Sequence, residues 1–392
     1  MTTLNKQALE QIIVKEIESK RAKFIETSHQ IHARPEIGNQ EYFASELLRT
    51  TLEEEGFSVQ AGIPEHETAF IARKSSSKAG PKIGFLAEYD ALEGLGHACG
   101  HNIIGTLSVA AAIGLSKVLN QIGGELVVLG TPAEEGGPNG SAKGTFVRHG
   151  LVQDIDACMM IHPYDKTAGT APTLAVDPID YKFYGKPTHA AVSPEKGINA
   201  LDGVIQLFNG INALRQHVTD DVRIHGIIID GGDAANIVPE YARARFFIRA
   251  KTRKACNEVT KKVNNIAEGA AFATGARVEI EPIQNGVDDF KLNTSFDQVF
   301  QNRIEELGED YQTSNKGLGS SDAGNISQVV PTIHPYIKIA EEGTALHTIP
   351  FREAGISEQG DQALITGAKA LALTGFDLIT DTEALARVKE AF

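Results

Sequence analysis

Two histidines and a cysteine lie within five residues of one another in the segment HACGH, which spans His97–His101. Cysteine and histidine are the side chains that bind zinc and similar metals, and a thiolate favours the softer ions. A cysteine in a protein interior is also commonly a small apolar residue. Cys99 and His101 are therefore compatible with a metal site, and equally with a packed thiol beside a hydrogen-bonded imidazole.

Two adjacent carboxylates and two separate histidines are further groups that could do chemistry. Glu134 and Glu135 lie in the segment TPAEEGG, where one carboxylate could bind a metal while the other accepts a proton. A solvated acidic turn is the alternative for this pair. His162 precedes a proline and His347 lies in a loop near the C-terminus, and each alone is compatible with a structural role.

Short apolar runs precede most of these polar groups and predict the strands that position them. Residues 83–87, 126–129 and 157–161 are apolar and of strand length, and residues 103–119 are typical of a buried helix. Strands that alternate with helices predict an α/β layer with a largely parallel sheet, flanked by helices on both faces. Ligands bind beyond the carboxyl ends of such strands, so we expect these polar clusters to meet in one crevice.

A second, smaller domain is predicted in the middle of the chain, where the expected order of elements is β-α-β-β-α-β. This order is that of the ferredoxin-like α+β unit. We therefore expect a catalytic α/β domain formed by residues 1–176 and 290–392, with an α+β domain inserted at residues 177–289. The expected strands of the insert are 174–184, 222–229, 241–249 and 277–283, and its helices are 197–217 and 253–273.

The catalytic domain is expected to begin and end with helices. The segment up to about Thr51 has helical apolar spacing, with a break at Ala33–Pro35. After the insert we expect a turn and helix at 317–330, a strand at 332–339, and helices at 359–373 and 382–392.

Charge and cysteine content exclude several classes of protein. The 392 residues include 37 Lys and Arg against 51 Asp and Glu, a net charge of −14, which argues against binding to nucleic acid or to an anionic membrane. Three cysteines in a long chain do not form a disulfide framework. The N-terminal segment is charged, and there is no run of about 18 apolar residues. We therefore expect a cytoplasmic protein.

Motifs along nearly the whole chain resemble the M20 metallopeptidase family. The resemblance is greatest to its amidohydrolase branch, in the group with p-aminobenzoyl-glutamate hydrolase subunits and related dipeptidases. Two residues depart from a common pattern of that branch, since Asn102 stands where many members have Asp and Tyr89 where many have Met. The motifs are HARPEIGNQE (His32–Glu41), EYDALEGLGHACGHN (Glu88–Asn102), TPAEEGG (Thr131–Gly137), IHP (Ile161–Pro163), GKPTHAAVSPEKGINAL (Gly185–Leu201), GGDAANIVPE (Gly231–Glu240), GSSDAGNIS (Gly319–Ser327) and ALHT (Ala345–Thr348).

The resemblance implies a site with two divalent metal ions, most simply zinc or manganese. It implies Glu134 as the general base and Asp90 as a carboxylate that supports a ligand, although Asp90 is also compatible with an ordinary strand-end cap. The implied metal ligands are Cys99, His101, Glu135, His162 and His347.

The resemblance also implies that the insert mediates a homodimer and contributes to the partner's site. His189 matches a histidine that stabilises the oxyanion, and Asn236 and Arg249 match positions that contact the substrate. Arg249 would bind a carboxylate of the substrate, because a guanidinium suits that group; an ordinary strand-face charge is the alternative.

The expected activity is hydrolysis of an amide bond in an N-acyl-amino acid or a dipeptide that has a free carboxylate. Two alternatives remain at this point. One is a deacylase of an N-acylated biosynthetic intermediate. The other is a non-catalytic metal-binding subunit or pseudoenzyme of a hetero-assembly, against which the spare carboxylate of Glu134 argues.

Overall fold

The protein is described by a computed structural model, in which residues 3–312 and 319–392 are placed. It divides into two compact units. The larger, here called the catalytic unit, takes its residues from 1–172, 290–318 and 322–392. The smaller, here called the inserted unit, comprises 173–289 together with the short segment 319–321. The predicted fold class, a mixed α/β domain with an inserted α+β domain, is confirmed.

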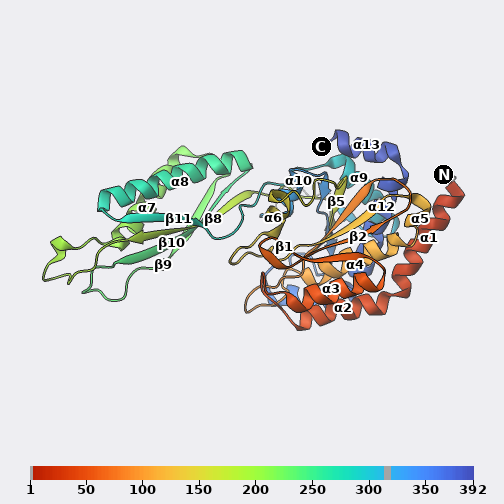
Figure 1. Cartoon of the computed structure of the whole chain (residues 1–392), viewed down its shortest axis with the longest axis horizontal. Coiled ribbons are helices and arrows are strands. Elements are labelled where there is room, and N and C mark those ends of the chain that lie inside the picture. Colours follow the sequence, from red (N-terminus) through yellow and green to blue (C-terminus); the bar gives the residue numbers. More distant parts are fainter. Residues whose placement is uncertain (1–2, 313–318) are drawn as a thin grey trace. The chain divides into compact units, whose positions relative to one another are not determined.

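The catalytic unit is built on a six-stranded sheet that is largely parallel (Figure 1). Four neighbouring strands run parallel, and a hairpin that the sequence analysis did not predict adds two antiparallel strands at one edge. In spatial order the strands are β1 (Ser58–Ile63), β2 (His66–Ser75), β4 (Glu125–Gly130), β3 (Lys82–Ala87), β5 (Ala157–Met159) and β13 (Thr332–Ile333).

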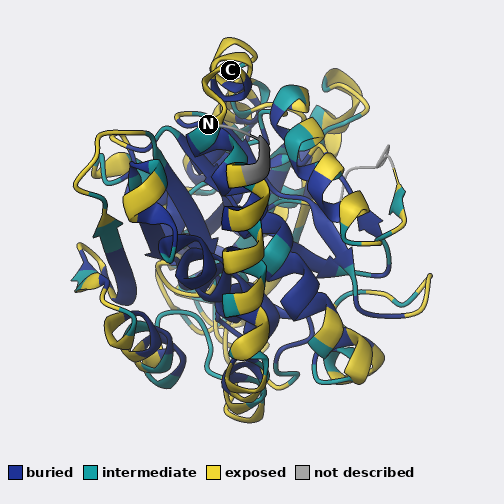
Figure 2. Cartoon of the chain, turned by 90° about the vertical axis from the view of Figure 1, so that its right-hand side faces the viewer, coloured by how far each residue is buried: buried dark blue, intermediate teal, exposed yellow. Residues whose placement is uncertain are grey.

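Both faces of this sheet are covered, as its continuous apolar strands predicted. Along β4, Leu126 and Val128 belong to one buried cluster, whereas Val127 and Leu129 belong to another on the opposite face. This split follows from the alternation of side chains along a strand. Figure 2 shows the strands of the catalytic unit buried between helices whose outer faces are exposed.

The helix α4 (His101–Ser116) is the central helix of the first face, and every one of its residues is buried. It packs against β3, β4 and the long helix α12 (Glu358–Thr380). The apolar length of α12 would suffice to cross a membrane, but 83% of its most apolar window is buried inside the catalytic unit, as expected of a core helix. Further helices are α1 (Thr3–Ser19), α2 (Arg21–Ala33), α3 (Tyr42–Glu54), α5 (Leu119–Ile122), α6 (Ala142–Arg148), α9 (Thr294–Glu306), α10 (Ala323–Ser327), α11 (Ile349–Ala354) and α13 (Thr382–Glu390).

The strand expected at 332–339 is wrong in one respect, because His334 and Pro335 divide it. Its first part is β13, and its second part, β14 (Tyr336–Lys338), belongs to a separate small sheet. The run at 157–161 is likewise shorter than expected, because β5 ends at Met159 and His162 begins a new strand. The small sheet has the order β12 (Tyr311–Gln312), β7 (Thr167–Ala168), β14 and β6 (His162–Tyr164). Of the turn and helix expected at 317–330, the helix is α10, and residues 317–318 lie outside the described residues.

The inserted unit has the expected β-α-β-β-α-β order and an antiparallel four-stranded sheet. Two helices cover one face of that sheet (Figure 1). Alternate residues of β10 are buried against these helices, so the other face of the sheet stays open. The spatial order is β11 (Arg277–Pro282), β8 (Ala175–Tyr184), β10 (Tyr241–Ala250) and β9 (Arg223–Asp230), and the helices are α7 (Ala200–Leu214) and α8 (Arg253–Thr274). Short 3-10 helices lie at Pro194–Lys196 and Arg215–His217.

Candidate metal centre and catalytic site

The structure brings the five predicted metal ligands together in the catalytic unit. They form two groups of three, each with ligand atoms within 4.8 Å of one another. Cys99 belongs to both groups. Its Sγ lies 3.6 Å from Nε2 of His162 and 3.5 Å from Nε2 of His347. The first group is Cys99, His101 and His162, and the second is Cys99, Glu135 and His347.

The ends of separate elements supply these side chains, as the sequence predicted. His101 is the first residue of α4, and His162 is the first residue of β6. Glu135 lies in the loop that follows β4. His347 has a left-handed backbone with φ of 60°, which is uncommon for a residue with a side chain, and its N–H donates to the carbonyl of Ala98 at 3.0 Å. Such strain persists where surrounding contacts hold it, and it is frequent at functional sites.

Hydrogen bonds on the far side of two imidazoles fix which nitrogen faces the cluster. Nδ1 of His101 lies 3.0 Å from Oδ1 of Asp90, and Nδ1 of His162 lies 2.7 Å from the carbonyl of Pro163. Both rings therefore present Nε2 to the cluster. Asp90 also accepts the backbone N–H of Glu135 on its second oxygen at 2.9 Å. One buried carboxylate thus supports two of the predicted ligands, which is the arrangement that metal-binding histidines commonly have.

The ligand groups differ in their pKa shifts. Burial opposes the charged form of His101, but Asp90 and Glu88 raise its pKa well above the usual range, and Glu135 raises the pKa of His347. Burial lowers the pKa of His162 to about 4, so the imidazole is neutral at pH 7 and can donate a lone pair. Burial, reinforced by the charge of Glu135, raises the pKa of Cys99 well above its ordinary range. The thiol therefore keeps its proton until a cation displaces it, because a metal ligand must be a thiolate.

The residues present fit divalent metal ions. Nε2 of His101 and Oε1 of Glu135 are both buried, and neither has a hydrogen-bond partner among the described residues. These two atoms lie 3.9 Å apart. Buried polar atoms normally have a partner, so two such atoms facing one another beside a thiol indicate a place for a cation. The donor set of one sulfur, three imidazoles and one carboxylate suits zinc and related ions.

Glu134 lies beside this cluster and forms a third candidate group with His101 and Glu135. Its Oε2 is 4.0 Å from Nε2 of His101, and its side chain is 13% exposed. Burial and the neighbouring carboxylates of Glu88 and Glu135 raise the pKa of Glu134 well above its usual range, in the absence of any cation. The residue before it, Ala133, has φ of 59° and donates its N–H to the buried Glu41 at 2.9 Å. This contact sets the course of the loop that carries Glu134.

Four residues of the site were missed as functional candidates by sequence reasoning. Glu41, Glu88 and Asp322 lie in motifs quoted above, but no role was given to them. Lys143 lies in the short helix α6, which reads AKGTFVR. It is wholly buried, with Nζ 2.7 Å from Oε1 of Glu88 and in an ion pair with Oδ1 of Asp322. Burial alone would lower the pKa of Lys143, but Asp322 and Glu88 raise it. The same helix also contains Arg148, so nothing in its sequence distinguishes the buried lysine from a surface one.

The two departures from the family pattern take structural roles. Asn102 donates to the hydroxyl of Ser28 at 2.9 Å and to the carbonyl of Gly355 at 3.1 Å. The hydroxyl of Tyr89 donates to the carbonyl of Thr68 at 2.7 Å. Both side chains therefore tie the chain segments around the site to the rest of the catalytic unit.

The inserted unit places His189 and Asn236 side by side. Ala190 donates its N–H to the carbonyl of Asn236 at 3.0 Å, and an isolated bridge joins His189 to Ile237. Both His189 and Asn236 are exposed. The N–H of Ala191 donates to Nδ1 of His189 at 3.2 Å. That contact requires the lone pair of Nδ1, so the proton of the neutral ring is on Nε2, which can donate to another group.

Arg249 lies on the open face of the inserted sheet. Its Nη1 donates to the hydroxyl of Ser320 at 2.7 Å, and its Nε lies 3.3 Å from Nε2 of His225. No carboxylate forms an ion pair with Arg249 within residues 3–312 and 319–392. Burial lowers its pKa. A partly buried guanidinium without an anionic partner is suited to an anion from outside the chain.

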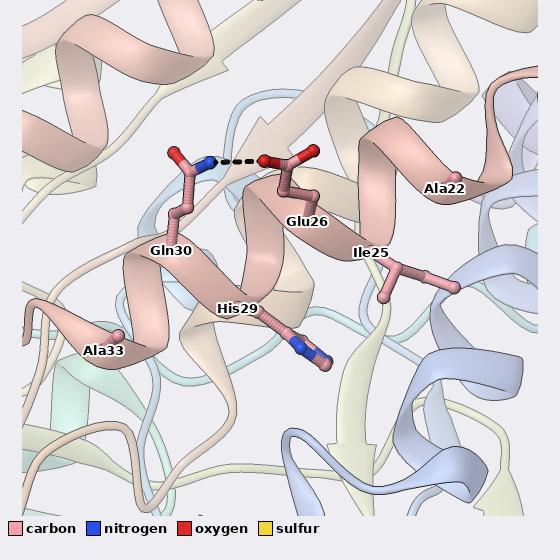
Figure 3. Close-up of a pocket in the computed structure, with 6 residues that line it drawn as sticks. All are labelled: Ala22, Ile25, Glu26, His29, Gln30 and Ala33. Atoms are coloured by element: carbon pink, nitrogen blue, oxygen red, sulfur yellow. Dashed lines mark hydrogen bonds between the residues drawn. The ribbon is translucent and has the colours of Figure 1, made fainter.

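A surface hollow along α2 is separate from these groups (Figure 3). Its one histidine, His29, lies 2.7 Å from Asp361. Gln30 donates to Glu26 at 3.1 Å (Figure 3). The hollow contains none of the predicted site residues. Its lining is Ala22, Ile25, Glu26, His29, Gln30 and Ala33.

Similarity to known proteins identifies the family. Residues 179–274 match a peptidase dimerisation domain of the M20 type. The chain is 35% identical to the Xaa-Arg dipeptidase of Mus musculus, with 93% of this chain and 88% of the relative covered. The chain belongs to the M20 metallopeptidase family. It is also 29% identical to a p-aminobenzoyl-glutamate hydrolase subunit from Escherichia coli, with 93% and 91% covered. These relatives identify this M20 member as a hydrolase.

Solved structures share the fold of this M20 hydrolase. An aminobenzoyl-glutamate utilization protein from Klebsiella pneumoniae has a TM-score of 0.73 at 18% identity, and covers 93% of this chain and 98% of its own. A dinuclear metal-binding peptidase of the M20 family from Bacillus subtilis has a TM-score of 0.66 at 19% identity, and covers 93% and 99%.

Proposed function

We propose that this M20 hydrolase cleaves the amide bond of an N-acyl-amino acid or dipeptide with a free carboxylate, and that Glu134 is the general base. The observation that carries the proposal is the pair of ligand groups that share Cys99, with Glu134 beside them. The names of its relatives, a dipeptidase and a p-aminobenzoyl-glutamate hydrolase subunit, support an amide bond next to an amino acid as the target.

Two divalent ions, zinc or manganese, would be held by the two groups. Cys99, His101 and His162 would hold one, and Cys99, Glu135 and His347 the other. When bound, such ions lower the pKa of water and polarise a carbonyl oxygen. A thiol among the ligands is sensitive to oxidation, so a reducing cytoplasm would suit this site.

Glu134 would accept the proton of the attacking water and return it to the leaving amine. Three features support this role. The side chain is largely buried, it is one residue from the ligand Glu135, and the contact of Ala133 with Glu41 holds its loop. A general base contributes about 10²–10⁴-fold to the rate when it is positioned in this way.

The inserted unit would bind the substrate. His189 has the tautomer needed to donate from Nε2 to a developing oxyanion, and Asn236 lies next to it. A positioned donor of this kind is worth several kcal/mol in acyl transfer. Arg249, which has Ser320 and His225 as its polar neighbours, would bind the substrate's carboxylate through its guanidinium.

A homodimer would form through the inserted unit. The match to a peptidase dimerisation domain supports this, as does the edge strand β9. Ile227, Ile228 and Ile229 on that strand are 60%, 47% and 37% exposed. An exposed apolar edge is a template for pairing with another strand, and a second copy of the same chain offers one.

The decisive experiment is hydrolysis of a matrix of N-acyl-amino acids and dipeptides by protein that has been chelated and then reloaded with zinc or manganese. Activity on carboxylate substrates, with about two metals per chain, is the expected result. Activity confined to one N-acylated biosynthetic intermediate would favour the deacylase. One tightly bound metal and no activity with any substrate would favour a non-catalytic subunit.

A further inference from the structure

A lysine without exposed surface lies next to the metal centre and has no part in the function proposed above. Lys143 is paired with Glu88 and Asp322, and all three side chains are wholly buried. An ammonium inside a protein is costly unless it is paired, but one carboxylate would neutralise it. The second carboxylate adds a net negative charge to the interior, which needs a reason other than stability.

Glu88 supplies that reason, because only one of its oxygens is used by the ammonium. Oε1 lies 2.7 Å from Nζ of Lys143, while Oε2 lies 3.6 Å from Nε2 of His101. Neither Oε2 of Glu88 nor Nε2 of His101 has a hydrogen-bond partner among the described residues. Oxygens of Glu134 and Glu135 face the same nitrogen at 4.0 and 3.9 Å. Glu88 is thus a third carboxylate, after Glu134 and Glu135, that faces Nε2 of His101.

Asp322 contacts both the side chain and the backbone of Lys143. Oδ1 pairs with the ammonium, and Oδ2 accepts the backbone N–H of Lys143 at 3.1 Å. Lys143 therefore cannot move away from Glu88 without losing two contacts to one carboxylate. The three residues come from α6, from the segment after β3 and from the residue before α10, so their positions are fixed by separate elements of the catalytic unit.

We propose that Lys143 is a positioning residue of the metal centre, which fixes Glu88 so that its free carboxylate oxygen faces Nε2 of His101. The inference rests on the two-metal function proposed above. Without the ammonium, Glu88 can rotate, and two buried carboxylates repel one another. The site then loses affinity for the ion that His101 binds. A purely electrostatic role predicts the opposite, because removal of a positive charge would strengthen cation binding.

The test measures metal affinity in chelated protein, by titration with Zn²⁺ and Mn²⁺ against a chromophoric chelator. Lys143→Met, Glu88→Gln and the double variant are compared with the wild type. We expect each single variant to bind one of the two ions about 10–100-fold more weakly, as for other residues that support a ligand. The double variant is expected to be no weaker than Glu88→Gln, because the lysine acts through the glutamate.

Two results would overturn the inference. Folded Lys143→Met protein that binds both ions as tightly as the wild type, or more tightly, removes the positioning role. If the losses of metal affinity in the two single variants add in the double variant, Lys143 does not act through Glu88. Should Lys143→Met not fold, Glu88→Gln decides, since it leaves Lys143 paired with Asp322; unchanged metal affinity in that variant also overturns the inference.

A matched control separates stability from metal binding. Arg303 and Asp377 form another largely buried pair in the catalytic unit, with Nε 2.6 Å from Oδ2. Asp377→Asn is expected to lower the melting temperature and leave both metal affinities unchanged. A wild-type chain that binds fewer than two ions would refute the proposed two-metal function and the inference with it, whereas normal wild-type binding with unaffected variants refutes the inference alone.

Discussion

Asp90 binds His101 through one carboxylate oxygen, at 3.0 Å from Nδ1, and leaves the opposite ring nitrogen facing the metal cluster. The second oxygen of Asp90 accepts the N–H of Glu135. This carboxylate therefore determines the orientation of one ligand and the backbone of another, although it belongs to neither ligand group.

Replacement of Asp90 by Ala is expected to lower metal affinity or turnover by about 10–100-fold, because His101 loses the partner that orients its ring. Metal titration and steady-state kinetics would check this. Asp361→Ala is a matched control, since it removes a carboxylate 2.7 Å from His29, on another helix and outside both ligand groups. Equal effects of the two substitutions would contradict a specific role for Asp90.

Replacement of Glu134 by Gln is expected to reduce kcat by about 10²–10⁴-fold while two metal ions stay bound. The amide keeps the size of the side chain and cannot accept the proton of water. Kinetics together with metal analysis would show both effects. Near-normal turnover would refute the assignment of the base, and loss of a metal would show that Glu134 is a ligand.

Replacement of Arg249 by Met is expected to raise KM for substrates with a free carboxylate by about 10–100-fold, because a hydrogen bond to a charged group is worth about 1.5–3 kcal/mol. Substrates that end in a carboxamide should be affected little. Arg243 lies on the same strand and open face, where it pairs with Asp180 at 3.5 Å, so Arg243→Met is the matched control. The prediction fails if Arg249→Met affects acid and amide substrates equally.

Stability is expected to fall as the pH drops from about 6.5 toward 4, in part because of His66. Burial lowers its pKa to about 4, between Asn39 at 2.6 Å and Thr145 at 2.9 Å. Below pH 6.5 the unfolded chain binds a proton at this ring that the folded chain does not, so acid favours unfolding. Through His66, acidification is expected to lower the free energy of unfolding by at most about 3 kcal/mol, with most of the loss complete near pH 4.

The free energy of urea unfolding at pH 7, 5.5 and 4.5 would measure this effect in the wild type and in His66→Asn. The variant is expected to be less stable at pH 7 but to lose less stability on acidification. Parallel pH dependence in the two proteins would show that another group is responsible.

The dimer is expected to dissociate when charge is placed on β9. Ile227→Asp combined with Ile229→Asp puts like charges on the edges of both copies, which opposes strand pairing. Light scattering after size-exclusion chromatography would report the mass. Phe272→Asp is the control, because Phe272 is 92% exposed on α8, which contacts β8, β10 and β11. A dimeric double variant would place the interface elsewhere.

The sequence predicted the parts of the structure that depend on strong periodicity. Continuous apolar strands followed by polar clusters predicted a covered, largely parallel sheet with Cys99, Glu134 and His162 at its strand ends. The six elements of the insert were predicted within a few residues of their bounds, because strands such as β10 alternate regularly between buried and open faces. The ligand set itself came from the family resemblance.

Elements with weak patterns were missed. The hairpin of β1 and β2 has no regular alternation in β1, and its turn contains Pro64 and Glu65. The run at 332–339 has residues that favour strands on both sides of His334 and Pro335, so its composition does not show that its two halves join different sheets. Lys143 and Glu88 could not be paired from the sequence, since 55 positions separate them and only the packing of α6 near the end of β3 brings them together.

The short segment 319–321 has a consequence for any attempt to exchange the insert between enzymes. These residues group with the inserted unit, although residue 322 already belongs to the catalytic unit. Ser320 in this segment contacts Arg249. A graft that carried only residues 173–289 would therefore bring the arginine and leave behind the partner that orients it. With the role proposed for Arg249, substrate specificity would depend on two separate stretches of sequence, and an exchange of the larger one alone would separate them.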